Sequence, residues 1–175
     1  KAMGGGRAPM VAITGWTETS LRPLLEPEVD ISLVNGVRRY VLSGPPAALE
    51  VVVARVERAQ AAAEAAFAAG QRCAPHDTLV EWLAVSAPFH SSSMTPAVAP
   101  LQAKARALGL SLDTARFAVP LLRYEDGEVW QPSDCFTRTQ SVGRVDWQAT
   151  MRSALRLEPT HAIDLGPGPG GAALD

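Results

Sequence analysis

The chain has 175 residues, of which 47% are hydrophobic and 19% are charged, and its formal net charge at pH 7 is -2. This length suffices for one domain with a buried core, and the composition is that of a globular protein rather than a disordered or fibrous one. The charge leaves no basic surface that would favour nucleic acid as a partner. No apolar run reaches eighteen residues and no charged-then-apolar leader comes first, so the sequence predicts neither a membrane span nor a secretory signal.

The two cysteines, Cys73 and Cys135, are too few for a disulfide framework and suit a reducing compartment, so we expect a cytoplasmic protein. Cys73 and His76 form a C-x-x-H half-motif, but no second pair at ligand spacing accompanies it. The sequence therefore predicts no metal site.

The first half of the chain alternates predicted strands and helices after a glycine-rich, flexible lead-in, residues 1–9, that lacks the lysine and hydroxyl of a P-loop. We expect strands at residues 10–14, 29–34, 40–44 and 79–85, and helices at residues 17–25 and 47–69, the longer one with Phe67 on its apolar side. Asn35-Gly36 is a turn signal between the second and third strands. The order β-α-β-β-α-β is the split βαβ arrangement of ferredoxin-like folds, which buries one sheet face under two helices.

His90 follows the apolar run of residues 79–85, which is typical of a buried strand that Pro88 and small residues bring to an end. Loops after strands are where a rigid scaffold holds reactive side chains open to substrate, and histidine readily takes and returns a proton near neutral pH. His90 is therefore a candidate catalytic base. The alternative is that it only caps the strand and hydrogen-bonds a nearby carbonyl.

The pattern changes after His90. We expect a helix at residues 95–108, a strand at 116–122, a helix at 133–139, a helix at 145–157 with Trp147, Met151 and Leu155 inward, and a short buried strand at 161–165. Strands separated by helices suggest a parallel sheet, but two or three strands make a poor sheet alone. The second half therefore looks like part of something larger.

Three ordered motifs resemble the malonyl-CoA:acyl carrier protein transacylase family, above all the acyltransferase domains of type I fatty acid synthases. They are ISLVNG at 31–36 with VLSGPP at 41–46, VSAPFHS at 85–91 and IDLGPG at 163–168. The resemblance covers nearly the whole chain. It implies an α/β fold in which a ferredoxin-like subdomain, residues 10–86, is inserted in an α/β-hydrolase-like parallel-sheet subdomain to which residues 87–175 return.

The resemblance implies a role for His90, which matches the family's catalytic histidine. That histidine takes the proton of a serine nucleophile during attack on an acyl thioester and returns it to the leaving thiolate. In many members a backbone carbonyl holds the histidine, from a helix with glutamine seven residues before a tryptophan. Gln140 precedes Trp147 by that interval (147 - 140 = 7), although Thr139 stands where an arginine is usual. Without the resemblance, Gln140 is an ordinary helix-surface residue.

Two further residues match the family near its substrate. Asn35 corresponds to an asparagine beside the substrate, with a plain turn as the alternative reading. Phe89, directly before His90, resembles the residue at this position in family members that take malonyl rather than branched extender units. The implied substrate is malonyl-CoA or another acyl-CoA, the acceptor is the phosphopantetheine of an acyl carrier protein, and no cofactor is bound permanently.

The family's nucleophile motif, G-H-S-x-G, does not occur in this sequence, and Ser43 and residues 91–93 lack its strand-to-helix context. The arginine that grips the malonyl carboxylate also lies upstream of the matching region. The chain resembles roughly the last three-fifths of an acyltransferase domain. We therefore expect an upstream segment or a second chain to supply the serine, and a lone copy to be inactive.

Two other functions remain open at this point. A non-catalytic ferredoxin-like module that docks a carrier protein would keep its function after His90→Ala. A serine thioester hydrolase of similar sheet topology would pass the acyl group to water without a carrier. Neither reading requires nucleic acid or a membrane as a partner.

Overall fold

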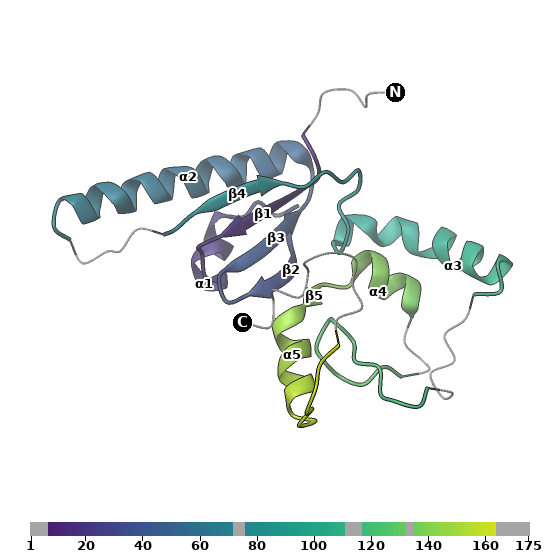
Figure 1. The fold of residues 1–175 in the computed structure, drawn as a ribbon. Coiled ribbons are helices and arrows are strands. Elements are labelled where there is room, and N and C mark those ends of the chain that lie inside the picture. Colours follow the sequence, from purple (N-terminus) through teal and green to yellow (C-terminus); the bar gives the residue numbers. More distant parts are fainter. Residues whose placement is uncertain (1–6, 72–75, 111–116, 132–134, 164–175) are drawn as a thin grey trace.

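A five-stranded sheet of order β4-β1-β3-β2-β5 forms the centre of the fold (Figure 1). The computed structural model describes residues 7–71, 76–110, 117–131 and 135–163. The strands are β1 (Met10–Thr14), β2 (Asp30–Gly36), β3 (Arg39–Ser43), β4 (Leu79–Trp82) and β5 (Val145–Asp146). The first four pair antiparallel, whereas β5 runs parallel to β2.

The helices begin and end where the sequence provides caps and breakers. They are α1 (Glu18–Leu21), the 3-10 helix η1 (Arg22–Leu24), α2 (Pro46–Ala68), the 3-10 helix η2 (Ser92–Ala97), α3 (Val98–Ala107), α4 (Phe136–Val142) and α5 (Trp147–Leu155). Thr17 and Ser20 form a reciprocal capping box at the start of α1. Gly70 follows α2 with a φ of 80°, a left-handed conformation that glycine adopts without strain.

The buried core lies between the sheet and α2. It is built from β-branched and leucine side chains of the strands and from one stripe of the helix, including Val11, Ile13, Leu42, Leu49 and Val52. Among the described residues after Val56, only Trp130 is a buried hydrophobic residue. The first half of the chain therefore holds the main core.

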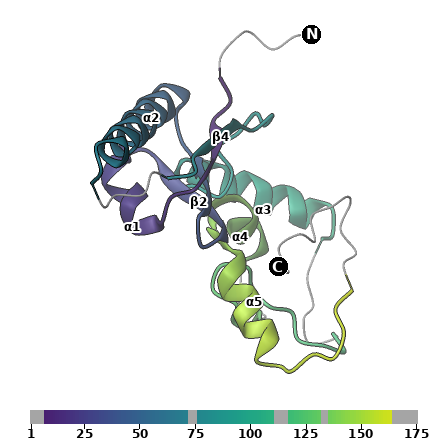
Figure 2. The same cartoon turned by 60° about the vertical axis from the view of Figure 1, so that its left-hand side comes forward.

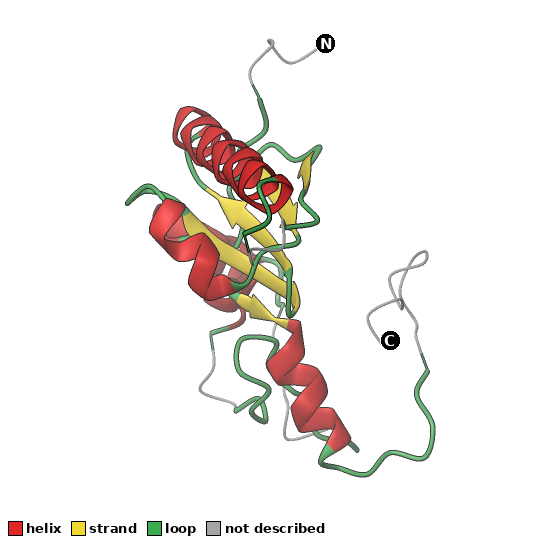
Figure 3. Ribbon diagram, turned by 90° about the vertical axis from the view of Figure 1, so that its left-hand side faces the viewer, coloured by secondary structure: helices red, strands yellow, loops and turns green. Residues whose placement is uncertain are grey.

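The predicted β-α-β-β-α-β order is confirmed, because β1, α1, β2, β3, α2 and β4 follow in this sequence and pair in the order 4-1-3-2. The mixed α/β class is confirmed as well. α2 lies along the sheet, and α5 leads from β5 away from it (Figures 2 and 3). Within the described residues, no helix combines the length and the apolar character that crossing a membrane requires.

Two local predictions in the first half are wrong. Asn35 and Gly36 belong to β2, and Val37 and Arg38 form the turn to β3, because an irregular register near the end of β2 lengthens the hairpin. Phe67 is 57% exposed, because the last turns of α2 extend past the strands (Figure 1).

β4 also differs from its prediction as a buried strand of residues 79–85. It ends at Trp82 and, within the described residues, is an edge strand that pairs with β1 alone; Leu79 is 62% exposed. Seven residues, 83–89, therefore separate the strand from His90 (89 - 82 = 7).

The second half departs furthest from prediction. Phe117 to Leu122 form no strand beyond a single bridge from Leu122 to Val129, and the expected helix at 145–157 begins only at Trp147. Trp147 and Leu155 are exposed rather than inward, and His161 to Ile163 are irregular. The parallel sheet is represented, in the part the structure describes, by β5 alone. Arg116 and the motif at 164–168 lie outside the described residues.

Candidate active site

His90 lies in the link between β4 and η2 and has a left-handed backbone, with a φ of 58°. Its N–H donates to the carbonyl of Ser141 in α4 at 2.8 Å. A left-handed conformation is uncommon for a residue with a side chain and persists where neighbouring contacts impose it, often at functional sites. The backbone of His90 is therefore held against α4 rather than free in a loop.

The imidazole of His90 is oriented by a backbone carbonyl. Its Nδ1 lies 2.8 Å from the carbonyl oxygen of Gly143. A carbonyl only accepts hydrogen bonds, so Nδ1 must carry the proton, and in the neutral ring the lone pair is then on Nε2. No described residue hydrogen-bonds to Nε2, so this nitrogen is available to accept a proton.

Gly143 is the C-terminal cap of α4, and a side chain there would have to displace its neighbours. A Cβ at this position would lie 2.0 Å from Oε1 of Glu125 and 2.9 Å from the carbonyl oxygen of Thr139. The Gly143 N–H donates to the carbonyls of Arg138 and Thr139. Gly143 was not among the site residues predicted from the sequence, although a glycine directly after a helical segment is a recognised C-cap signal.

Tyr124 packs against the edge of the His90 ring, with the ring centroids 5.6 Å apart at an interplanar angle of 88°. Its hydroxyl donates to the carbonyl of Thr139. Burial, and to a lesser extent the neighbouring Glu125 carboxylate, raises the pKa of Tyr124. The hydroxyl therefore remains protonated and keeps this hydrogen bond, a role that the sequence did not indicate.

Two buried serines, Ser43 and Ser91, hydrogen-bond to backbone carbonyls of the two residues before His90. Ser43 is fully buried, and its Oγ lies 2.9 Å from the carbonyl oxygen of Phe89 and 2.8 Å from Oγ of Ser32. Ser91 is also buried and donates to the carbonyl of Pro88. Both hydroxyls are thus engaged with backbone carbonyls in this structure.

Phe89 and Gln140 line one cavity of about 1100 Å³ between α3 and α4. Phe89 is 40% exposed, and Gln140 is on the exposed side of α4. The structure thus brings together three of the four residues predicted for the site, His90, Phe89 and Gln140, around one helix. The hydrogen bond to Nδ1 of His90 comes from the carbonyl of Gly143, three residues after Gln140.

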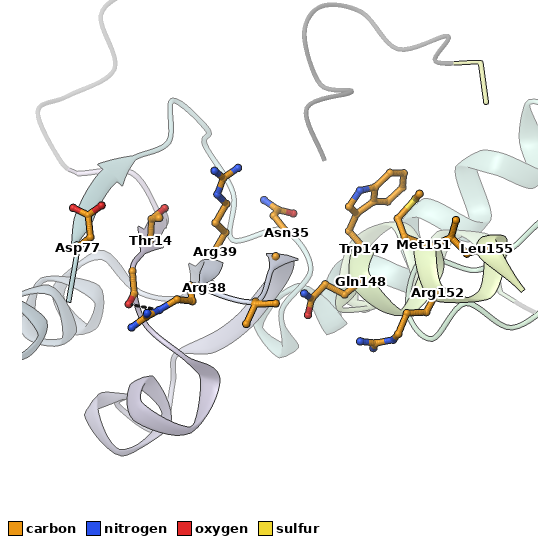
Figure 4. Close-up of a pocket in the computed structure, with 13 residues that line it drawn as sticks. Thr14, Asn35, Arg38, Arg39, Asp77, Trp147, Gln148, Met151, Arg152 and Leu155 are labelled. Carbon is orange, nitrogen blue, oxygen red and sulfur yellow. Dashed lines mark hydrogen bonds between the residues drawn. The ribbon is translucent and has the colours of Figure 1, made fainter. Parts of the chain in front are cut away.

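Asn35 lines a different cavity, of about 860 Å³, between the β2–β3 turn and α5 (Figure 4). Figure 4 shows Asn35, Arg39 and Trp147 pointing to one side of this cavity, and Arg38 and Arg152 to the other. Arg38 donates through Nε to the carbonyl of Gly15 at 2.9 Å. Asn35 is therefore placed apart from the cavity beside His90.

Of the C-x-x-H half-motif, Cys73 lies outside the described residues. His76 stacks on Trp16, with ring centroids 3.9 Å apart. Within the ranges that the structure describes, no three His, Cys, Asp or Glu residues form a group that could hold a metal ion.

Comparison with known proteins gives relatives whose chains are much longer than this one. No family model matches. The chain is 25% identical to the fatty acid synthase subunit beta of Saccharomyces cerevisiae, over 94% of this chain and 8% of the relative. It is 27% identical to the fatty acid synthase beta subunit stcK of Emericella nidulans, over 97% of this chain and 10% of the relative.

Solved structures of acyltransferases have a fold similar to that of this chain. The acyltransferase domain from the second module of the salinomycin polyketide synthase superposes with a TM-score of 0.70 and 26% identity, over 98% of this chain and 37% of that one. The chain resembles an acyltransferase. The malonyl-CoA:acyl carrier protein transacylase of Synechocystis is similar as well, with a TM-score of 0.65, 26% identity, and coverage of 97% and 51%.

The resemblance to acyltransferases predicted from the three motifs is thus confirmed. The chain spans about a tenth of the curated relatives' length and about half or less of these solved chains. That share of the solved acyltransferases is somewhat smaller than the expected three-fifths.

Proposed function

We propose that the domain to which this chain belongs transfers an acyl group, malonyl in the first instance, from coenzyme A to the phosphopantetheine thiol of an acyl carrier protein. The observation that carries the proposal is the hydrogen bond from Nδ1 of His90 to the carbonyl of Gly143. It leaves Nε2 of the neutral imidazole as the proton acceptor, which is the requirement for a histidine that activates a hydroxyl.

The reaction proceeds in two matched halves. Nε2 of His90 takes the proton of a serine hydroxyl as its oxygen attacks the thioester carbonyl carbon. The tetrahedral adduct collapses, the carbon–sulfur bond breaks, and the coenzyme A thiolate takes the proton back from Nε2. The pantetheine thiol then gives its proton to Nε2, attacks the acyl-serine ester, and the serine oxygen recovers the proton.

The serine comes from an upstream segment or a second chain in this proposal, because Ser43 and Ser91 are buried and engaged with backbone carbonyls. Residues 10–86 act as the ferredoxin-like subdomain, and residues 87–175 belong to the larger subdomain. Phe89, directly before the base, and Gln140 line one cavity and contact the acyl group or its pantetheine arm. Asn35 contacts a more remote part of the substrate, and this chain alone is inactive.

The test is acyl transfer by the domain assembled with its serine-bearing segment, with malonyl-CoA as donor and phosphopantetheinylated carrier protein as acceptor. His90→Ala should lower turnover by on the order of 10³ or more, as for other triad bases. His161→Ala is the matched control, because His161 is exposed and, among the residues that the structure describes, hydrogen-bonds only to the adjacent Thr160.

Unchanged transfer after His90→Ala would mean that the chain acts as a binding module. Release of malonate to water at the same rate with and without carrier protein would instead assign a thioester hydrolase. Either result would overturn the proposed transfer.

A further inference from the structure

We propose that Arg144 and Glu18 form a positioning pair that fixes the Gly143 carbonyl and, through it, the tautomer and orientation of His90. The inference rests on the proposed function in that it assigns His90 the role of base. Arg144 directly follows Gly143 in the chain, and Glu18 begins α1, 126 residues earlier. The pair thus joins the ferredoxin-like half to the segment that holds the histidine.

The contact between the two side chains is bidentate. Nη1 of Arg144 donates to Oε1 of Glu18 at 3.1 Å, and Nη2 donates to Oε2 at 2.7 Å. The hydrogen bond from Arg144, acting against burial, lowers the pKa of Glu18. Two parallel charge-assisted bonds fix both the distance and the plane of the guanidinium, which a single point charge would not do.

Glu18 is itself anchored to the sheet. Its N–H donates to Oη of Tyr40 at 3.1 Å, and this hydroxyl donates to the carbonyl of Val37 at 2.8 Å. Tyr40 is buried in β3, and Arg22 pairs with the same carboxylate. These contacts restrict the position of the Glu18 carboxylate, so its hydrogen bonds restrict the position of the Arg144 guanidinium as well.

The backbone on the other side of the pair is short and held at both ends. Gly143 caps α4, and Val145 pairs with Leu33 as the first residue of β5. Between them, the side chain of Arg144 leads to Glu18, and no residue that the structure describes hydrogen-bonds to its buried Nε. The two hydrogen bonds to Glu18 are therefore what fixes the guanidinium beside this short backbone segment.

Loss of the pair would free the peptide between Gly143 and Arg144. A carbonyl that rotates away no longer accepts from Nδ1 of His90, so the proton can move to Nε2 and the ring can no longer accept a proton from serine there. The effect should fall on the chemical step rather than on substrate binding. Misplacement of this kind costs on the order of 10- to 100-fold in kcat with little change in KM.

The tautomer can be read directly in this chain by long-range ¹H–¹⁵N correlation NMR on histidine-labelled protein, without any acyl transfer. The wild type should show the Nδ1–H form of His90. Glu18→Gln and Arg144→Gln should each give a substantial population of the Nε2–H form, and the double variant should be no worse than either single one, because both remove the same contact. Arg144→Lys keeps the charge and should lie between.

Arg22→Gln is the matched control, because it removes the other partner of Glu18 and leaves the bidentate pair in place. It should keep the Nδ1–H form. An unchanged His90 tautomer in both Glu18→Gln and Arg144→Gln, with the fold intact by circular dichroism, would overturn the positioning role. If the tautomer shifts but His90→Ala leaves acyl transfer unaffected, the pair stands and the proposed function fails.

Discussion

Replacing Gly143 with alanine should disturb His90 although the substitution adds a single methyl group. The added Cβ would lie 2.9 Å from the carbonyl oxygen of Thr139, and ordinary contact begins at 3.4 Å, so these atoms must separate by about 0.5 Å (3.4 - 2.9 = 0.5). The same Cβ would lie 2.0 Å from Oε1 of Glu125, a side-chain end that can swing away. The backbone contact with Thr139 cannot be relieved so easily.

The shift acts on the carbonyl that holds His90, because Gly143 supplies both the crowded Cβ position and the hydrogen-bond acceptor. We expect a loss of stability of about 1–3 kcal/mol, as for other overpacked sites. We also expect kcat of the assembled domain to fall by on the order of 10-fold or more. Chemical denaturation of the chain and steady-state transfer by the domain measure the two effects separately.

Two further variants sharpen this test. Glu125→Ala in the Gly143→Ala background removes the 2.0 Å contact and should recover only part of the loss, since the clash with Thr139 remains. Gly36→Ala is the control for stability, because its Cβ would meet nothing closer than 3.6 Å. Wild-type stability together with wild-type kcat in Gly143→Ala would refute the argument that the carbonyl is held in one place.

Three other predictions concern stability and can be checked by denaturation of the chain. Ser43→Ala removes the hydroxyl that faces the Phe89 carbonyl and should cost about 1–2 kcal/mol, whereas the exposed Ser93→Ala should be neutral. Leu49→Ala opens a cavity between α2 and the sheet and should cost about 3 kcal/mol, whereas Val51→Ala on the same helix, 44% exposed, should change stability by less than about 0.5 kcal/mol. Because the pKa of Glu18 is lowered by Arg144, the ion pair stabilises the fold above the ordinary glutamate pKa of about 4.3 and this stabilisation is lost as the pH falls through the lowered value. Glu18→Gln should thus be less stable than wild type at pH 7, and the difference should shrink in acid; a difference that stays constant down to pH 3 would contradict this.

The first half of the fold could be predicted because its signals are local. Alternating apolar residues define β1, proline and alanine define α2, and Thr17 with Ser20 caps α1. Asn35-Gly36 was one exception, because the pairing of β2 with β3 moves the turn two residues along the chain. The exposed Phe67 and the early end of β4 were others.

The second half could not be predicted in the same way, because its apolar residues have few partners within the chain. Leu108, Val119 and Leu155 are each more than 60% exposed, so apolar periodicity there does not indicate what is buried in this structure. A strand prediction from such residues depends on contacts that local pattern does not contain.

The candidate base was found from sequence, but its supports were not. His90 stands out as a histidine after an apolar run, whereas Gly143 contacts it from 53 residues away and Tyr124 from 34 residues away (124 - 90 = 34). Arg144 and Glu18 are ordinary surface residues by pattern. Only the tertiary fold shows that these groups act on one imidazole.

The most direct test of His90 as base is the rate at which malonyl-CoA acylates the assembled domain, followed by the intact mass of every polypeptide. If His90 is the base, the malonyl group should appear on the companion segment bearing G-H-S-x-G, this chain should gain no mass, and His90→Ala should slow the acylation by on the order of 10³. Acylation of this chain itself, or acylation of the His90→Ala domain at the wild-type rate, would contradict this role of His90.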